Sequence, residues 1–247
     1  MNLVLLEAGE LNADGRVLLT GPRAAHIVNV LGVAPGQTVR VGVLEGPRGV
    51  GTVASIIGNT VALDCAMEAE APPRPRVDLL LAVPRPKVMR RLWAQLAALG
   101  VSRIILTNAE RVERPYFDTH VLTPECYRPL LIEGLQQARD TRLPVVSIHR
   151  RFKVLVEDEL GALSDAGLRL VADPGATASA GEAIRGRVGA DGEARVLLAV
   201  GPEGGWNAFE LRLLEVHGFQ RVGMGPRTLR TDTACLALLA LVQDALA

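Results

Sequence analysis

The chain has 247 residues, of which 49% are hydrophobic and 22% are charged, and its 27 basic and 27 acidic side chains give a formal net charge of zero. This composition is ordinary for a globular protein, and the zero balance gives no sign of a chain that binds nucleic acid through bulk charge. The longest strongly apolar run, residues 234–242, is far short of the ~20 residues that span a bilayer, and the first residues lack the basic flank and cleavage site of a signal peptide. We therefore expect a cytoplasmic protein with no membrane partner.

Residues 1–70 are predicted to form a small β-barrel. Apolar-rich segments separated by turn residues occur at 16–20, 38–45, 49–56 and 59–67, and a helical turn is predicted near 26–31. Short strands with a turn after each are typical of small barrels. The next six residues, 71–76, contain three prolines and are predicted to be a stiff, extended linker.

Residues 77–247 change to an alternation of strands and helices. Strands are predicted at 77–83, 101–107, 145–148, 168–173, 194–200 and 221–225, and helices at 86–100, 124–138, 207–217 and 232–246. A repeated strand–helix–strand pattern predicts a parallel sheet covered by helices, so the fold class is α/β. Ligands of such sheets bind in loops at the carboxyl ends of strands, which here selects the loops 173–175, 201–205 and 225–230.

The charge distribution along the chain is uneven. Residues 77–150 hold 11 basic and 7 acidic side chains, and 25 of the 27 cations in the whole chain are arginines. Arginine suits forked contacts to phosphate, although a GC-rich genome would also produce an excess of it. The three cysteines form no Cys-x-x-Cys pair and the four histidines form no cluster, so we predict free thiols and no metal.

The glycine-rich loop GPEGG at 201–205 does not match a phosphate-binding motif. The chain has neither a Gly-Lys-Ser/Thr loop nor a Gly-x-Gly-x-x-Gly fingerprint at this strand end, and Glu203 would repel a polyanion. A neutral or cationic ligand fits the loop better, and a simple tight connection is the alternative. Arg227 and Arg230 follow on a later loop, where two fixed cations favour an anionic or electron-rich substrate.

These two loops carry a resemblance to a known family. V-GPEGG-W at 200–206, followed by GMGPRTLRTDTA at 223–234, resembles the C-terminal signature of RsmE-type 16S ribosomal RNA (uracil N3) methyltransferases of the SPOUT superfamily. Residues 82–112 and 131–147 are similar to that family's first βαβ segment and central helix–strand junction. Residues 26–41 resemble the start of its N-terminal domain, so the resemblance covers nearly the whole chain.

The resemblance implies a fold and a reaction that periodicity could not show. Residues 77–247 would form a trefoil-knotted parallel-sheet methyltransferase domain, and residues 1–70 a PUA-like RNA-binding β-barrel. A homodimer would bind S-adenosylmethionine, release S-adenosylhomocysteine and methylate N3 of a specific uridine in 16S rRNA, within the assembled small ribosomal subunit. The chain departs from the family at Asp232, where glutamate is common, and at Gly32, where arginine is usual.

Site residues follow from the same resemblance, in three groups. Arg230 would stabilise charge on the uracil carbonyls with Arg227 or Arg139 in support, and Asp232 or water would accept the N3 proton. The cofactor would be held by Ala172, Asp173, Val200, Gly201, Glu203, Gly204, Gly205, Met224, Gly225, Leu229 and Thr233. The substrate RNA would contact His26, Gln137, Arg139 and Arg142.

Three other functions stay open on the sequence. A SPOUT enzyme acting on another RNA, at a ribose hydroxyl or on tRNA, would share the pocket and differ in its product. A non-catalytic RNA-binding protein would bind no cofactor. A dinucleotide-dependent oxidoreductase is disfavoured because the fingerprint for that cofactor is missing.

Overall fold

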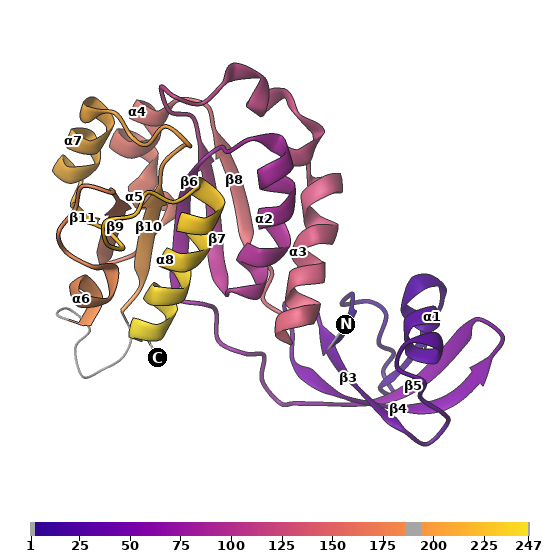
Figure 1. Ribbon diagram of the computed structural model, residues 1–247. Helices are drawn as coiled ribbons and strands as arrows, with labels where there is room; N and C mark the ends of the chain where they lie inside the picture. Colours follow the sequence, from indigo (N-terminus) through magenta and orange to yellow (C-terminus); the bar gives the residue numbers. More distant parts are fainter. Residues whose placement is uncertain (1–2, 186–193, 247) are drawn as a thin grey trace. The chain divides into compact units, whose positions relative to one another are not determined.

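The computed structural model describes residues 3–185 and 194–246, and the chain divides into two compact units (Figure 1). Unit 1 consists of Met1–Arg74 and Ile132–Leu143, and unit 2 consists of Pro75–Leu131 and Pro144–Ala247. The domain boundaries predicted from the sequence put residues 132–143 in the larger domain, 77–247, whereas the structure places this segment in unit 1.

Unit 1 is built on a five-stranded sheet with the strand order β1-β3-β4-β5-β2. β1 pairs in parallel with β3, and the other pairs are antiparallel. Inward-facing side chains, Val39 and Val41 on β3 and Val61 and Leu63 on β5, form its core together with Ile27 of helix α1. The elements are β1 (Val4–Leu6), β2 (Arg16–Leu19), α1 (Gly21–Asn29), β3 (Thr38–Val43), β4 (Arg48–Ile57) and β5 (Thr60–Met67). All but β1 were expected, and closure of the sheet into a barrel stays a prediction.

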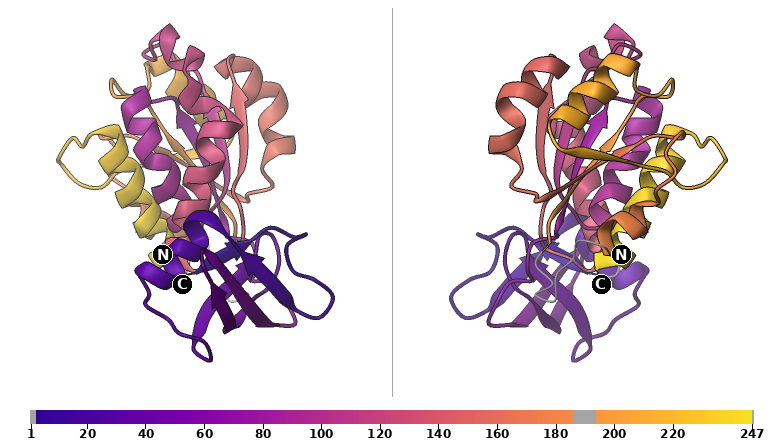
Figure 2. Two further views of the ribbon diagram at one scale, coloured as in Figure 1. Left: turned by 90° about the vertical axis from the view of Figure 1, so that its right-hand side faces the viewer. Right: turned by 90° about the vertical axis from the view of Figure 1, so that its left-hand side faces the viewer.

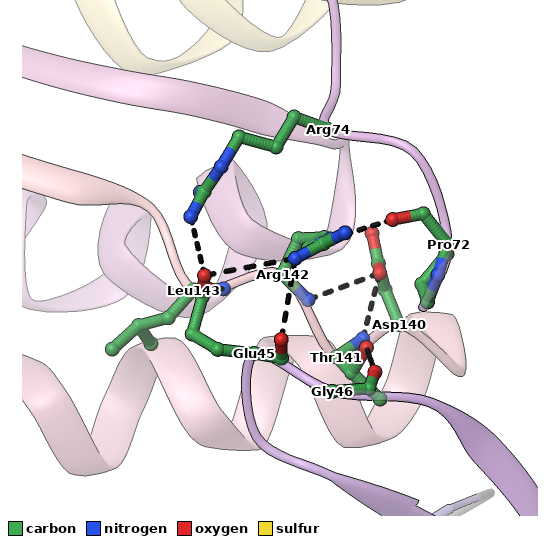
Figure 3. Close-up of polar contacts among 8 residues, drawn as sticks. All are labelled: Glu45, Gly46, Pro72, Arg74, Asp140, Thr141, Arg142 and Leu143. Atoms are coloured by element: carbon green, nitrogen blue, oxygen red, sulfur yellow. Dashed lines mark hydrogen bonds and ion pairs between the residues drawn. The ribbon is translucent and has the colours of Figure 1, made fainter. Parts of the chain in front are cut away.

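Segment 132–143 is attached to unit 1 through the turn between β3 and β4 (Figure 3). The backbone N–H of Glu45 donates to the carbonyl of Thr141 at 2.8 Å, and the Thr141 hydroxyl donates to the carbonyl of Gly46 at 2.7 Å. The Glu45 carboxylate accepts from the N–H of Leu143 at 2.6 Å and pairs with Arg74. Glu45 holds this position with a φ of 63°, a backbone conformation that few non-glycine residues adopt.

Unit 2 contains a six-stranded sheet in which every neighbouring pair is parallel, in the order β11-β9-β10-β6-β7-β8. Every residue of β6 and β10 is buried, as expected for strands covered by helices on both faces. In Figure 2, α2 and α8 cover one face, and the helical segment 152–163 lies on the other. The strands are β6 (Val77–Ala82), β7 (Val101–Thr107), β8 (Val145–His149), β9 (Leu168–Ala172), β10 (Val196–Val200) and β11 (Phe219–Val222). The predicted α/β class with a parallel sheet is confirmed.

The helices of unit 2 include four that were predicted and several that were not. Those predicted are α2 (Pro86–Ala98), α3 (Pro124–Ala138, which continues into unit 1), α7 (Ala208–Val216) and α8 (Thr231–Leu246). Those not predicted are the 3₁₀ turns Arg114–Asp118 and His120–Leu122, the π turn Leu155–Glu159 between α4 (Phe152–Val154) and α5 (Leu160–Leu163), and α6 (Ala180–Arg185). β11 ends at Val222 and not at 225, because the N–H of Gly223 leaves the ladder and donates to the carbonyl of Ala178.

Two further findings concern bilayers and cysteines. Among the helices of residues 3–185 and 194–246, none combines the length and apolarity needed to cross a bilayer. The three cysteines are free thiols, as expected: Cys235 is fully buried, and Cys65 and Cys126 are half-buried. Burial raises the pKa of Cys235 to about 12, so this thiol stays protonated at neutral pH.

Candidate active site

The three loops selected from the sequence meet in one cleft at the carboxyl ends of β9, β10 and β11. The N–H of Asp173, after β9, donates to the carbonyl of Val222 at the end of β11 at 3.0 Å, which joins two of the loops. The cleft has a volume of ≈ 190 Å³ and opens to solvent. Its lining consists of Ala172, Asp173, Pro174, Val200, Gly201, Pro202, Glu203, Gly204, Gly205, Val222, Gly223, Met224, Gly225, Arg227, Thr228, Leu229, Thr231, Ala234 and Leu238.

The GPEGG loop is a tight turn closed by a hydrogen bond from the N–H of Gly205 to the carbonyl of Pro202 at 2.8 Å. Gly205 has a φ of 71°, which explains the glycine at this position. A Cβ on Gly201 would lie 3.1 Å from the ring of Trp206, so the turn packs directly on that indole. Trp206 in turn packs on Phe152, with ring centroids 5.3 Å apart, so this aromatic pair supports the turn from behind.

Two arginines that the sequence did not single out hold the same turn from outside. The Arg111 guanidinium, on the loop after β7, donates to the carbonyl of Gly204. The backbone N–H of Arg85, just before α2, donates to Oε1 of Glu203 at 3.2 Å. The loops after β6 and β7 therefore position the turn on which the candidate ligand would rest.

The loop from Gly223 to Leu229 presents backbone groups to the cleft. A Cβ on Gly223 would lie 2.8 Å from the carbonyl oxygen of Ala176, so only glycine fits there, and Gly225 has a φ of 95°. Within the described part of the chain, the amides of Met224, Gly225 and Leu229 have no intramolecular acceptor. These amides lie in the half-buried to exposed part of the cleft lining, so they are free to donate to a ligand with acceptor atoms.

The two arginines of the same loop are exposed at the cleft. Arg227 belongs to the cleft lining, and Arg230 lies between Leu229 and Thr231, which both line it. Neither guanidinium contacts a carboxylate among the residues that the structure describes. Two uncompensated cations at the entrance favour a substrate that carries or develops negative charge.

Asp232 and Thr233 lie outside the cleft lining. Helical geometry gives the reason: residues one turn apart share a face, so Thr231, Ala234 and Leu238 point into the cleft and the two intervening residues do not. The Asp232 carboxylate instead faces α2, where it accepts from the Arg91 guanidinium at 2.9 Å. The structure therefore does not bring the predicted proton acceptor or this predicted cofactor contact to the cleft.

The four residues predicted to contact RNA all lie in unit 1, in different environments. Gln137 and Arg139 are exposed at the end of α3, and Arg139 has a φ of 61°. The side chain of Arg142 is only 19% exposed and donates to the carbonyls of Pro72 at 2.5 Å and Glu45 at 3.2 Å (Figure 3). His26 is half-buried, and its Nε2 has no hydrogen-bond partner within the described residues.

These contacts predict a difference in stability between two neighbouring arginines. We expect Arg142→Ala to lower the free energy of unfolding by about 1–3 kcal/mol, because the half-buried carbonyl of Pro72 and the exposed carbonyl of Glu45 lose their donor. Arg139→Ala should change it by less than about 0.5 kcal/mol, as for other exposed positions without such contacts. Urea denaturation followed by circular dichroism checks both values, and equal losses would contradict the structural role of Arg142.

A parallel sheet whose carboxyl-end loops form a glycine-lined cleft, with arginines at its entrance, is an arrangement suited to an enzyme that binds a small ligand beside an anionic substrate. The sequence comparisons place the chain among RNA methyltransferases. Residues 71–243 match the family model of the RNA methyltransferase domain, a range that contains the whole cleft. The chain is 32% identical over 247 residues to ribosomal RNA small subunit methyltransferase E of Treponema pallidum, covering 98% of this chain and 90% of that protein. It is 24% identical to ribosomal RNA small subunit methyltransferase E 1 of Borreliella burgdorferi, covering 96% and 95%.

Solved structures share the fold. Ribosomal RNA small subunit methyltransferase E from Neisseria gonorrhoeae, bound to S-adenosyl methionine, superposes with a TM-score of 0.75 at 20% identity, covering 99% of this chain and 97% of that one. The chain therefore belongs to the family of ribosomal RNA small subunit methyltransferases E, and the resemblance found in its sequence is confirmed.

Proposed function

We propose that the protein transfers a methyl group from S-adenosylmethionine to N3 of a specific uridine in the 16S rRNA of the small ribosomal subunit. The observation that carries the proposal is the cleft: every residue predicted to hold the cofactor except Thr233 lines it, in a chain of this family. Support for the substrate comes from the curated relatives, whose names state small-subunit ribosomal RNA.

The residues of the cleft fit this cofactor chemically. The unpaired amides of the 223–229 loop can donate to the nitrogens of an adenine edge, and the apolar side chains of Val222, Leu229 and Leu238 suit its ring faces. The exposed carboxylate of Glu203 suits a cationic ligand better than a polyphosphate, whereas the Asp173 carboxylate already pairs with Arg221 at 3.4 Å. When bound, S-adenosylmethionine supplies a methyl group activated by its sulfonium and leaves as S-adenosylhomocysteine.

The arginines of the loop would prepare the uracil for attack. Arg230 holds the ring and stabilises the negative charge that grows on O2 and O4 as the N3 proton leaves, and Arg227 supports it from the cleft lining. Arginine stays protonated and cannot take that proton. Because the Asp232 carboxylate is bound by Arg91, water is the proton acceptor that we favour, with Asp232 fixing the start of α8 against α2.

The family resemblance also supports finer proposals about architecture and partners. Residues 77–247 form a trefoil-knotted SPOUT domain, residues 1–70 a PUA-like RNA-binding barrel, and residues 71–76 the linker between them. The enzyme works as a homodimer in the cytoplasm on the assembled small subunit. Of the residues proposed to contact RNA, Arg139 and Gln137 are exposed, as such a contact requires, whereas Arg142 is held by carbonyls of its own unit.

The decisive experiment is a methylation assay with defined products. Purified protein is incubated with methyl-labelled S-adenosylmethionine and unmodified small ribosomal subunits, with stripped 16S rRNA and tRNA in parallel. The RNA is then digested to nucleosides and analysed by mass spectrometry. We expect 3-methyluridine, chiefly with the subunits. A ribose-methylated nucleoside or label only in tRNA would replace the proposed reaction, and bound cofactor without any label would indicate a binding-only protein.

Gly223 offers a sharp test of the cofactor cleft. We expect Gly223→Ala to raise the Kd for S-adenosylmethionine by about tenfold, since overpacking against the backbone carbonyl of Ala176 displaces the cleft loop at ~1–3 kcal/mol. Gly167→Ala is the matched control, because a Cβ there meets nothing within 4 Å. Calorimetric titration of both folded variants gives the answer, and equal affinities would argue against the 223–229 loop as the cofactor site.

A further inference from the structure

A second hollow in unit 2 lies at the carboxyl ends of β7 and β8, where the sequence predicted no site residue. It has a volume of ≈ 560 Å³ and is bordered by the loop after β7, the turn after β8 and the start of α7. Because all six strands are parallel, this hollow and the cleft lie at the same end of one sheet. We call it the basic groove.

Four exposed cations border the basic groove: Arg114, Arg150, Arg151 and Lys153. Among the described residues, Arg114 and Arg151 have no carboxylate partner. Arg150 pairs with Asp118 at 3.0 Å and Lys153 with Glu157 at 3.8 Å. Exposed pairs of this kind are weak, so both cations can exchange their partner for another anion.

Two carboxylates also border the groove, and one of them is buried and hydrogen-bonded to the backbone. Glu210 is 3% exposed, and its oxygens accept from the N–H of Glu110 at 2.7 Å and of Asn207 at 2.8 Å. These bonds stabilise the buried carboxylate and tie the loop after β7 to the first turn of α7. Of the two carboxylates that line the groove, Glu110 is therefore the exposed one.

An aromatic side chain stands at the rim of the groove. Phe209, on the first turn of α7, is 57% exposed. Cations beside an exposed aromatic face are the combination that binds single-stranded nucleic acid, because the cations contact phosphates and the ring stacks on a base. An apolar small molecule would not suit so polar a lining.

The basic groove and the cleft share a wall. Gly201–Gly205 line the cleft, and three residues of the following segment, Asn207, Phe209 and Glu210, line the groove. Trp206 lies between them and packs on Phe152, which also borders the groove. An extended strand bound in the groove would therefore run beside the cofactor cleft.

We propose that the basic groove binds the phosphodiester backbone of single-stranded RNA flanking the target nucleotide, with Phe209 stacking on an adjacent base. This inference rests on the proposed function, since it takes the substrate to be RNA. It assigns a substrate-binding surface to unit 2, in addition to the contacts proposed for unit 1.

The test compares two double variants of equal charge, Arg114→Ala/Arg151→Ala in the groove and Arg90→Ala/Arg212→Ala on exposed positions that line neither the groove nor the cleft. For the groove variant we expect an unchanged Kd for S-adenosylmethionine and a KM for subunits about tenfold higher, with the slope of log affinity against log salt reduced by about 1.4. Phe209→Ala should raise KM without changing the salt slope, because stacking releases no counterion.

Each outcome decides the inference. A groove variant with the KM and salt slope of the control would overturn it, as would polyglutamate competing as well as single-stranded RNA of the same charge. If the wild-type protein methylates nothing, the proposed function fails, and the groove is judged on its affinity for a labelled single-stranded 16S rRNA fragment. Weaker binding than that of the control supports the groove, and equal binding rejects it.

Discussion

Replacing Asp78 by alanine is expected to lower the free energy of unfolding of unit 2 by about 1–3 kcal/mol, because it leaves the Ser164 hydroxyl and one donor of the Arg195 guanidinium without their buried acceptor. Asp78 is the second residue of β6 and is 1% exposed. Its carboxylate accepts from the Ser164 hydroxyl at 2.7 Å and from the Arg195 guanidinium at 3.2 Å. These contacts lie near the amino ends of the strands, opposite to the cleft.

Asp165 provides the matched control, since it pairs with the same cation. Its carboxylate lies 2.9 Å from Arg195 but is 80% exposed, so Asp165→Ala should cost less than about 1 kcal/mol. Both tryptophans, Trp93 and Trp206, belong to unit 2, so urea denaturation followed by tryptophan fluorescence reports on this unit. Equal decreases in the free energy of unfolding of the two variants would show that the buried Asp78 carboxylate stabilises the fold no more than the exposed Asp165 carboxylate does.

The cofactor affinity of the surviving folded Asp78→Ala protein separates stability from function. We expect it to match that of the wild-type protein at low temperature, because none of the residues in this ion pair lines the cleft. A parallel loss of binding would mean that the amino ends of the strands shape the cleft.

The elements that the sequence predicted best are those with strong local signals. Helix α3 runs from Pro124 to Ala138 as predicted, with proline in its first turn and a left-handed residue, Arg139, directly after it. The segment 152–163 escaped prediction because a π turn interrupts it, so its apolar residues never repeat at one helical period. β1 has three residues, which is too short to show alternation.

The site residues that could be predicted are also those with local sequence signals. Gly225 and the GPEGG turn can be recognised from the sequence, because glycine and proline favour particular backbone conformations wherever they occur. Arg85 and Arg111 could not be found in this way, because they are 118 and 93 residues away from the groups that they contact. The sequence prediction began α8 at Asp232, one residue after its start at Thr231. The side chains of α8 that point into the cleft depend on how the helix is rotated about its axis, which the sequence alone does not show.

Arg230→Ala should lower kcat by about 10²–10³-fold and leave the Kd for S-adenosylmethionine nearly unchanged, since the side chain would act only on charge that develops in the transition state. The guanidinium is exposed and pairs with no carboxylate within the described residues, so its charge is available to a bound substrate. It also directly precedes the N-terminus of the 16-residue helix α8, whose dipole adds positive potential at the same place.

Two further variants separate charge from geometry. Arg230→Lys keeps the charge but replaces a planar fork by a single ammonium, so we expect it to recover little of the lost rate if two uracil oxygens must be held together. Arg227→Ala removes the neighbouring cation and should have a smaller effect. Single-turnover methylation of small subunits gives the rates, and calorimetry gives the cofactor affinity.

The pattern of the losses assigns the role of each group. A fall in kcat alone places Arg230 at the reacting base, whereas loss of cofactor binding would reassign it to the cleft lining. Asp232→Asn completes the set, because asparagine can still accept from Arg91 but cannot take a proton. If water accepts the N3 proton, Asp232→Asn keeps most of the rate and Arg230→Ala does not. If Asp232 is the base, both variants fail, and the carboxylate must leave Arg91 during turnover.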